Sequence, residues 1–141
     1  MQISKYLSKI SGPLLDRIDL QVFVEPVTYT QISGTERAES SEAIRARVEQ
    51  ARERQQERFG GKGIYANCQM DSRQVEQYCR VDAEGEKLLR AAFANLKMSA
   101  RGYTRVLKVA RTIADLDGAE EISVRHVAEA IQYRNLDRQI W

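Results

Sequence analysis

The sequence predicts a mainly helical protein, in which a helical bundle follows a short N-terminal segment with the character of a strand. Only two prolines, Pro13 and Pro26, occur in 141 residues, and both lie near the N-terminus. The rest of the chain therefore lacks the residue that breaks helices most strongly. Beyond residue 40 the apolar residues recur at helical spacing, whereas before Pro26 they alternate with a period of two.

The composition indicates a folded, soluble domain. Hydrophobic residues make up 43% and charged residues 30% of the chain, a balance that favours a globular core over disorder. The formal net charge of +2 is too small to indicate nucleic-acid binding by itself. No apolar run approaches the roughly 18 residues of a membrane span, and no signal peptide is recognisable at Met1. Two cysteines without a disulfide pattern favour a reducing compartment, so we expect a cytoplasmic protein that does not contact membranes.

Residues 18–24 have the pattern of a single β-strand. Their apolar members alternate with polar or outward-facing ones, and Pro26 ends the run. The alternating residues are Ile18, Leu20, Val22 and Val24. A strand this short needs partner strands, and no second convincing strand follows. We therefore expect its partners to lie outside this chain, and we interpret residues 26–40 as a linker.

The longest predicted helix begins near Ser40 or Ser41 and runs to about Phe59, where Gly60 ends it. Its apolar stripe is thin and consists of Ile44, Val48 and Ala51. The remaining surface is rich in Arg, Glu and Gln, which favours a solvated face over a surface that contacts DNA or a partner. Residues 64–70 are expected to form a loop.

Shorter helices fill the rest of the chain, and each begins at a residue that caps helix N-termini well. The capping residues are Asp71 (which forms a capping box with Gln74), Asp82, Ser99 and Ser123. The helix after Ser99 is expected to run to about Leu116, with Gly118 ending it. The predicted buried faces consist of Leu88, Leu89, Ala92, Phe93 and Leu96, then Val106, Leu107, Ala110, Ile113 and Ala114, and finally Val124, Val127, Ala128 and Ile131.

Two kinds of site are not expected in this chain. The run Gly60-Gly61-Lys62-Gly63 follows a helix rather than a strand and lacks the Ser or Thr that holds Mg²⁺ in a phosphate-binding loop. No aliphatic run ending in paired acids is present, so we expect the chain alone not to hydrolyse ATP. Cys68, Cys79 and His126 lack the CxxC spacing of a zinc site. For His126 a structural or surface role is expected, and no metal site is predicted.

Arg17 is a candidate catalytic residue. It lies at the edge of the predicted strand, after a tight Gly12-Pro13 turn, so its backbone would be held on a rigid element. Phosphoryl-transfer ATPases use such an arginine to neutralise charge on the transferring phosphate, an effect worth about 1000-fold or more in rate. From chemistry alone, a solvated surface cluster with Asp16 and Asp19 is the stronger interpretation.

A second candidate is the helix predicted to follow Ser99. Arg101, Arg105, Lys108 and Thr112 share one face by their i, i+4, i+7, i+11 spacing. Cations at a helix N-terminus oppose the helix dipole, which suggests that an anion binds there. A solvated basic face is the competing interpretation, and it leads on chemistry alone.

Three long segments together resemble one protein family. Residues 14–20 read Leu-Leu-Asp-Arg-Ile-Asp-Leu, residues 99–116 read Ser-Ala-Arg-Gly-Tyr-Thr-Arg-Val-Leu-Lys-Val-Ala-Arg-Thr-Ile-Ala-Asp-Leu, and residues 126–134 read His-Val-Ala-Glu-Ala-Ile-Gln-Tyr-Arg. They resemble the magnesium-chelatase-like, ComM-type AAA+ ATPases, and the match covers nearly the whole chain except residues 26–40. The resemblance implies that residues 1–25 are a remnant of the α/β ATPase core and that residues 41–141 are the helical lid.

The resemblance also assigns roles to the candidate arginines. Arg17 falls on the arginine finger, which acts in trans on a neighbouring subunit, and Arg101 falls on the sensor-2 arginine near the γ-phosphate. Arg105 is a further candidate for nucleotide contact, and Thr104 stands where relatives more often carry histidine. The whole protein is expected to use ATP and Mg²⁺, with neither bound tightly by this chain, and to form a homo-hexameric ring that acts on DNA, as in branch migration. The alternatives are a motor subunit of a magnesium chelatase and a helical DNA-binding or interaction module.

Overall fold

The computed structural model describes residues 17–22, 24–34, 38–96 and 98–134. In these ranges the chain forms the helices α3 (Tyr29–Ser33), α4 (Ser41–Phe59), α5 (Ser72–Tyr78), α6 (Ala83–Asn95), α7 (Ala100–Leu116) and α8 (Val124–Gln132), with a short 3-10 turn η1 (Asn67–Gln69). The described residues contain no strand, and their one isolated bridge is the parallel pair Val81 and Ile122. The predicted mainly helical fold is confirmed.

Local capping chemistry sets where these helices begin. The side chains of Ser40, Asp71, Asp82 and Ser99 accept hydrogen bonds from the first-turn N–H groups of their helices, at 3.2, 2.8, 2.6 and 3.0 Å respectively. Each bond satisfies a backbone donor that has no partner within the helix. At the other end of α7, Gly118 has a φ of +74° and reverses the chain, as expected.

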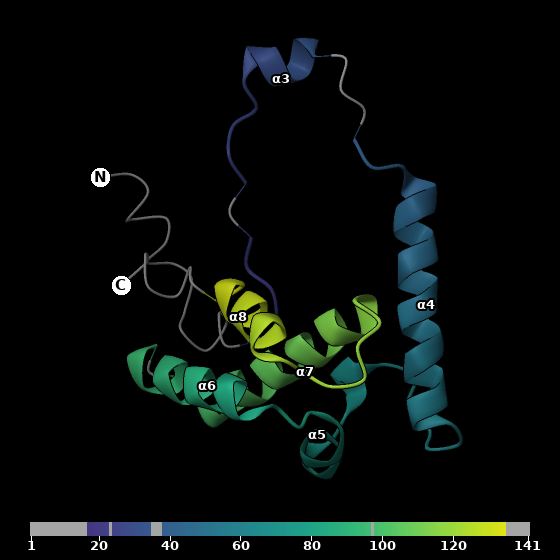
Figure 1. Cartoon of the computed structure of the whole chain (residues 1–141), viewed down its shortest axis with the longest axis vertical. Coiled ribbons are helices and arrows are strands. Elements are labelled where there is room, and N and C mark those ends of the chain that lie inside the picture. Colours follow the sequence, from purple (N-terminus) through teal and green to yellow (C-terminus); the bar gives the residue numbers. More distant parts are fainter. Residues whose placement is uncertain (1–16, 23, 35–37, 97, 135–141) are drawn as a thin grey trace.

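Helix α7 is the centre of the core. Its buried residues Val106, Leu107, Ala110 and Ala114 pack with the other helices, which contribute Phe59 from α4, Leu89 from α6, and Val127 and Ala130 from α8. Figure 1 shows α6, α7 and α8 gathered in one body, with the lower half of α4 beside the end of α7. The amphipathic pattern of α7 therefore places it correctly at the centre of the domain.

Parts of the predicted buried faces are wrong. Phe93 is 43% exposed and lies edge-on to Tyr103, with ring centroids 6.1 Å apart. Val124 is 39% exposed at the start of α8. Both residues lie toward the edges of their apolar stripes, where only packing against a third element decides whether a side chain is covered.

Helix α4 packs through only half of its length. Ile44 and Val48, predicted to be buried, are exposed, and all residues from 41 to 50 are solvent-accessible. The buried residues are Ala51, Gln55 and Phe59, which follow one another at i, i+4 spacing in the second half. In Figure 1 the first half of α4 projects away from the body formed by α5–α8.

The N-terminal segment differs from the predicted strand. In the described part of residues 18–24 no ladder forms, and Ile18, Leu20, Val22 and Val24 are all exposed. The physical reason is that a strand needs a neighbouring strand for its backbone groups, and the described ranges offer none. Residues 26–40 also contain an element that was not predicted, the five-residue helix α3, which Thr28 caps.

Candidate nucleotide-contact face

The segment that carries Arg17 lies against α7 through an ion pair. Arg105 Nη1 on α7 is 2.9 Å from Asp19 Oδ1. The side chain of Arg105 is 22% exposed and that of Asp19 is 52% exposed, so water screens the pair only in part. Arg105 was predicted as a candidate for nucleotide contact, and in this structure its guanidinium contacts a carboxylate of the same chain.

Two backbone contacts fix the same segment to the end of α8. The N–H of Gln21 donates to the carbonyl of Tyr133 at 2.9 Å, and Arg134 Nη1 donates to the carbonyl of Ile18 at 3.3 Å. Arg134 is only 2% exposed. A Cβ added at Gly102 would lie 3.8 Å from Arg134 Nη2, so this guanidinium also lies over the first turn of α7.

Arg17 and Arg101 are both exposed, and each lies near in sequence to a residue that takes part in these contacts. Arg17 precedes Asp19 by two residues, and Arg101 precedes Arg105 by about one helical turn. Within the described ranges, neither guanidinium has a hydrogen-bond or ion-pair partner. The contacts thus join the segment that carries Arg17 to the helix that carries Arg101, and both arginines are exposed.

The rest of the predicted basic stripe is engaged within the chain. Lys108 Nζ donates to the carbonyl of Cys68 at 2.9 Å. Thr112 Oγ1 accepts from Asn67 Nδ2 at 3.1 Å and donates to the carbonyl of Lys108 at 2.9 Å. These residues share one face of α7, as predicted from their spacing, but Lys108 and Thr112 form hydrogen bonds with the η1 turn.

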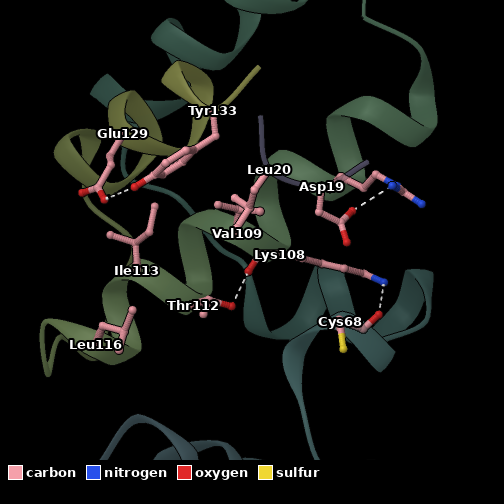
Figure 2. Close-up of a pocket in the computed structure, with 11 residues that line it drawn as sticks. Asp19, Leu20, Cys68, Lys108, Val109, Thr112, Ile113, Leu116, Glu129 and Tyr133 are labelled. Atoms are coloured by element: carbon pink, nitrogen blue, oxygen red, sulfur yellow. Dashed lines mark hydrogen bonds and ion pairs between the residues drawn. The ribbon is translucent and has the colours of Figure 1, made fainter. Parts of the chain in front are cut away.

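A pocket of about 360 Å³ lies beside the Arg105–Asp19 pair. Its wall is mostly apolar, and Figure 2 shows Leu20 facing α7 there. The apolar lining residues are Leu20, Val109, Ile113, Leu116 and Tyr133. Tyr133 donates a hydrogen bond to Glu129 at 3.3 Å, and burial together with the charge of Glu129 raises the pKa of this phenol.

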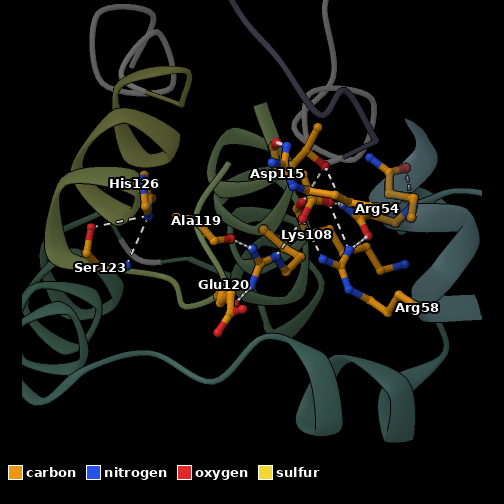
Figure 3. Close-up of polar contacts among 12 residues, drawn as sticks. Arg54, Arg58, Lys108, Asp115, Ala119, Glu120, Ser123 and His126 are labelled. Atoms are coloured by element: carbon orange, nitrogen blue, oxygen red, sulfur yellow. Dashed lines mark hydrogen bonds and ion pairs between the residues drawn. The ribbon is translucent and has the colours of Figure 1, made fainter. Parts of the chain in front are cut away.

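The buried carboxylate of Asp115 joins α4 to α7. Asp115 is fully buried, and Arg58 of α4 binds both of its carboxylate oxygens, at 2.8 Å on Oδ2. Asn67 Nδ2 donates to Oδ2 at 2.7 Å, and Arg111 Nε to Oδ1 at 3.1 Å. Arg54 Nη1 reaches the backbone carbonyl of Asp115 at 3.0 Å (Figure 3). Charge-assisted bonds of this kind compensate the cost of burying the carboxylate.

Arg111 extends this network into the connection between α7 and α8. Its Nη1 and Nη2 atoms each donate at 2.7 Å, to the carbonyls of Glu120 and Ala119. Arg111 is 3% exposed, and burial lowers the pKa of its guanidinium while the Asp115 carboxylate opposes that shift. The sequence interpretation missed both residues, although their i, i+4 spacing within the apolar face of α7 was a usable signal.

The residues of the rejected zinc site do not converge on a metal centre. Cys68 is exposed, whereas Cys79 lies in the core, where burial raises the pKa of its thiol to about 11. His126 is buried, and its Nδ1 accepts from the N–H of Ser123 at 3.0 Å while Nε2 contacts Asp117 Oδ2 at 3.1 Å. This histidine completes the capping box of α8 (Figure 3), a structural role. Within the described residues, no group of three or more His, Cys, Asp or Glu side chains is placed to hold a metal ion.

Comparison with known families identifies the helical body. Residues 38–134 match the family model for the C-terminal part of magnesium chelatase subunit ChlI. The chain belongs to this magnesium chelatase family. Residues 1–32 match a second model of the family, described as magnesium chelatase subunit ChlI, so both the segment of Arg17 and the helical body are family sequence. The resemblance found from the sequence is confirmed.

Curated relatives match the chain from end to end. The chain is 40% identical over 138 residues to competence protein ComM of Haemophilus influenzae, and this covers 97% of the chain and 26% of ComM. It is 38% identical over 142 residues to the protein YifB of Escherichia coli, again covering 97% of the chain and 26% of the relative. The chain therefore spans about a quarter of the length of these family members. In the parts that the structure describes, no helix has the length and apolarity to cross a membrane.

Proposed function

We propose that this chain is the lid region of a ring-forming AAA+ ATPase that couples ATP binding and hydrolysis to remodelling of DNA or translocation on it, as in branch migration. The observation that carries the proposal is the match to competence protein ComM at 40% identity over 97% of the chain. The exposure of both arginines supports it, because phosphate recognition needs accessible arginine.

The two arginines have different tasks in this proposal. Arg17 acts across the subunit boundary and neutralises the charge that develops on the phosphate transferred in a neighbouring subunit. Arg101 acts from the lid as the sensor-2 residue. ATP and Mg²⁺ bind to other parts of the whole protein, neighbouring copies in the ring are the partners, and the cytoplasm is the compartment.

The test uses the full-length protein that contains this sequence. Arg17→Ala is expected to abolish ATP hydrolysis while ATP binding stays within about twofold, because the finger acts mainly on the transition state. Arg73→Ala on α5 is the matched control, since Arg73 is an exposed arginine far from the candidate face in sequence. Branch migration of a labelled four-way DNA junction is the second readout.

Mixing of subunits tests the trans assignment. Arg17→Ala subunits and subunits that lack the phosphate-loop lysine are each inactive alone. In mixed rings some interfaces combine an intact loop with an intact Arg17, so activity is expected to return. Mixed rings that assemble and stay inactive would overturn the assignment of Arg17, and an active ATPase without any effect on DNA would overturn the DNA substrate.

A magnesium chelatase motor is the second candidate, and the description of both matching family models favours it. It predicts ATP-dependent insertion of Mg²⁺ into a porphyrin when the other chelatase subunits are supplied, an activity that the DNA motor lacks. A helical DNA-binding or interaction module is less well supported, because Arg105 and Lys108 of the basic stripe are engaged within the chain.

A further inference from the structure

The contacts between the N-terminal segment and the lid join residues that are far apart in sequence. The Arg134–Ile18 hydrogen bond alone spans 116 positions. Three contacts fall within four consecutive residues of the segment, on the carbonyl of Ile18, the carboxylate of Asp19 and the N–H of Gln21. These contacts hold the segment although its apolar side chains Ile18, Leu20, Val22 and Val24 are exposed.

We propose that Arg105 is a positioning residue that, together with Arg134, latches residues 18–21 onto the lid and so sets the place of Arg17. In this assignment Arg105 acts on the nucleotide only through Asp19 and the segment. The latch itself is a property of this chain, whereas its consequence for hydrolysis rests on the proposed function.

Arg105 is well suited to hold a partner in place. It projects from the middle of a helical turn whose next two residues, Val106 and Leu107, are buried, so its backbone is fixed in the core. The nearby cation Lys108 donates to the carbonyl of Cys68 and does not compete for Asp19. The guanidinium of Arg105 is therefore the group on this face of α7 that meets the carboxylate.

The hydrogen bonds to the backbone of the segment fix its position on the lid more closely than the ion pair does. An ion pair alone tolerates a shift of the segment by an ångström or more, because both side chains are flexible. The hydrogen bond from the N–H of Gln21 to the carbonyl of Tyr133 does not, because it holds only over a narrow range of distances and angles. Arg134, which is buried, fixes the carbonyl of Ile18 from the other side.

Arg17 lies one residue before this pinned stretch. The backbone of Arg17 is therefore held relative to α7. Because Arg101 lies on α7, the two arginines move together with the lid. Precision of this kind matters to a catalytic arginine, because a misplacement of about 1 Å can cost roughly 100-fold in rate. The structure thus supplies a reason for the Asp19–Arg105 pair beyond the small stability that a partly exposed ion pair provides.

The first arm of the test measures the latch in the 141-residue chain by amide hydrogen exchange at Gln21. Arg105→Asp and Asp19→Arg are each expected to speed this exchange by about two- to fivefold, the range for loss of a partly exposed ion pair. The double variant that carries both changes restores an ion pair with reversed polarity and should return exchange to the wild-type rate. Arg101→Ala, outside the latch, should leave it unchanged. Unaltered exchange in both single variants would overturn the latch.

The second arm uses the full-length ATPase and separates positioning from direct phosphate contact. A positioning role predicts that Arg105→Ala and Asp19→Ala lower kcat alike, with ATP affinity within about twofold, and that the charge-swapped double variant recovers activity. If Arg105 contacts phosphate, Asp19→Ala is harmless and the swap is worse than either single change, because it places a carboxylate at the phosphate. That result would overturn the proposal. An inactive Arg17→Ala variant together with fully active Arg105→Ala and Asp19→Ala variants would overturn only the positioning role. A wild-type full-length protein without ATPase activity, alongside the expected exchange rates in the 141-residue chain, would overturn only the proposed function.

Discussion

Arg58 of α4 and Asp115 of α7 form a two-pronged ion pair in which the carboxylate is fully buried. The two residues are separated by 57 positions in the chain and come from different helices. Asn67 and Arg111 complete the shell of the carboxylate. Two arginines share one aspartate here, so the carboxylate of Asp115 offsets part of the positive charge of both guanidinium groups.

Removal of this carboxylate should destabilise the domain strongly. Asp115→Ala leaves Arg58 and Arg111 without their anion inside the protein, and a loss of about 3–5 kcal/mol in the free energy of unfolding is expected. Urea unfolding followed by circular dichroism measures it. The control is Glu84→Ala, which breaks the exposed Lys87–Glu84 pair and should change stability by less than about 0.5 kcal/mol. Equal effects of the two changes would show that Asp115 is not the anchor of α4.

Gly118 and Gly61 form a matched pair for testing the α7–α8 connection. Both have positive φ, +74° and +75°, so an alanine at either position costs about 1–2 kcal/mol from the backbone alone. A Cβ at Gly118 would also lie 3.0 Å from Arg54 Nη2, whereas a Cβ at Gly61 meets nothing within 4 Å. Gly118→Ala should therefore destabilise the protein more than Gly61→Ala in urea unfolding. Identical unfolding midpoints would mean that Arg54 moves aside without cost.

The two cysteines should differ sharply in reactivity. Cys68 is exposed, whereas Cys79 is buried with a pKa of about 11, so it is neutral and covered at pH 8. Alkylation at pH 8 is expected to modify Cys68 rapidly and Cys79 only after unfolding, which peptide mass spectrometry distinguishes. Because the folded-state pKa of Cys79 is raised above its unfolded value of 9.0, its contribution to stability is complete below about pH 9 and declines as the pH rises toward 11. Rapid double modification of the native protein would contradict this placement.

The isolated chain should not turn over ATP. It contains no Gly-rich loop ending in Lys followed by Ser or Thr, the element that holds the phosphates and Mg²⁺ in such enzymes. A phosphate-release assay with the purified 141-residue protein should match the rate of an Arg17→Ala version and of buffer. Turnover that depends on Mg²⁺ and scales with protein concentration would contradict the interpretation of this chain as a lid region.

Sequence reasoning predicted the helix starts well because capping is local chemistry. Asp71 with Gln74 and Ser99 with the N–H of Gly102 involve residues three apart, and nothing distant alters those bonds. The centre of α7 was also predictable, since Ala110 lies in the middle of a wide apolar stripe.

The errors concern features that depend on distant partners. Ile44 is exposed because none of the described elements packs on the first half of α4. Residues 18–22 form no strand because no strand lies beside them in the described part of the chain. Asp115 was missed because charged residues were interpreted as solvated, although buried charges are satisfied by partners remote in sequence. At the candidate site Arg17 and Arg101 stay predictions from the sequence, and the sequence did not indicate that Asp19 pairs with Arg105.

Helix α4 is anchored to the domain through its second half, and its first half projects from the domain. Its base is held by Arg54, Arg58 and the buried residues of its second half, while residues 41–50 are exposed. Ten residues of helix extend about 15 Å, so a tilt of about 10° at the base moves the free end by roughly 2.6 Å. A small tilt of α4 at its contact with the end of α7 therefore displaces most strongly the end where α4 begins (Figure 1).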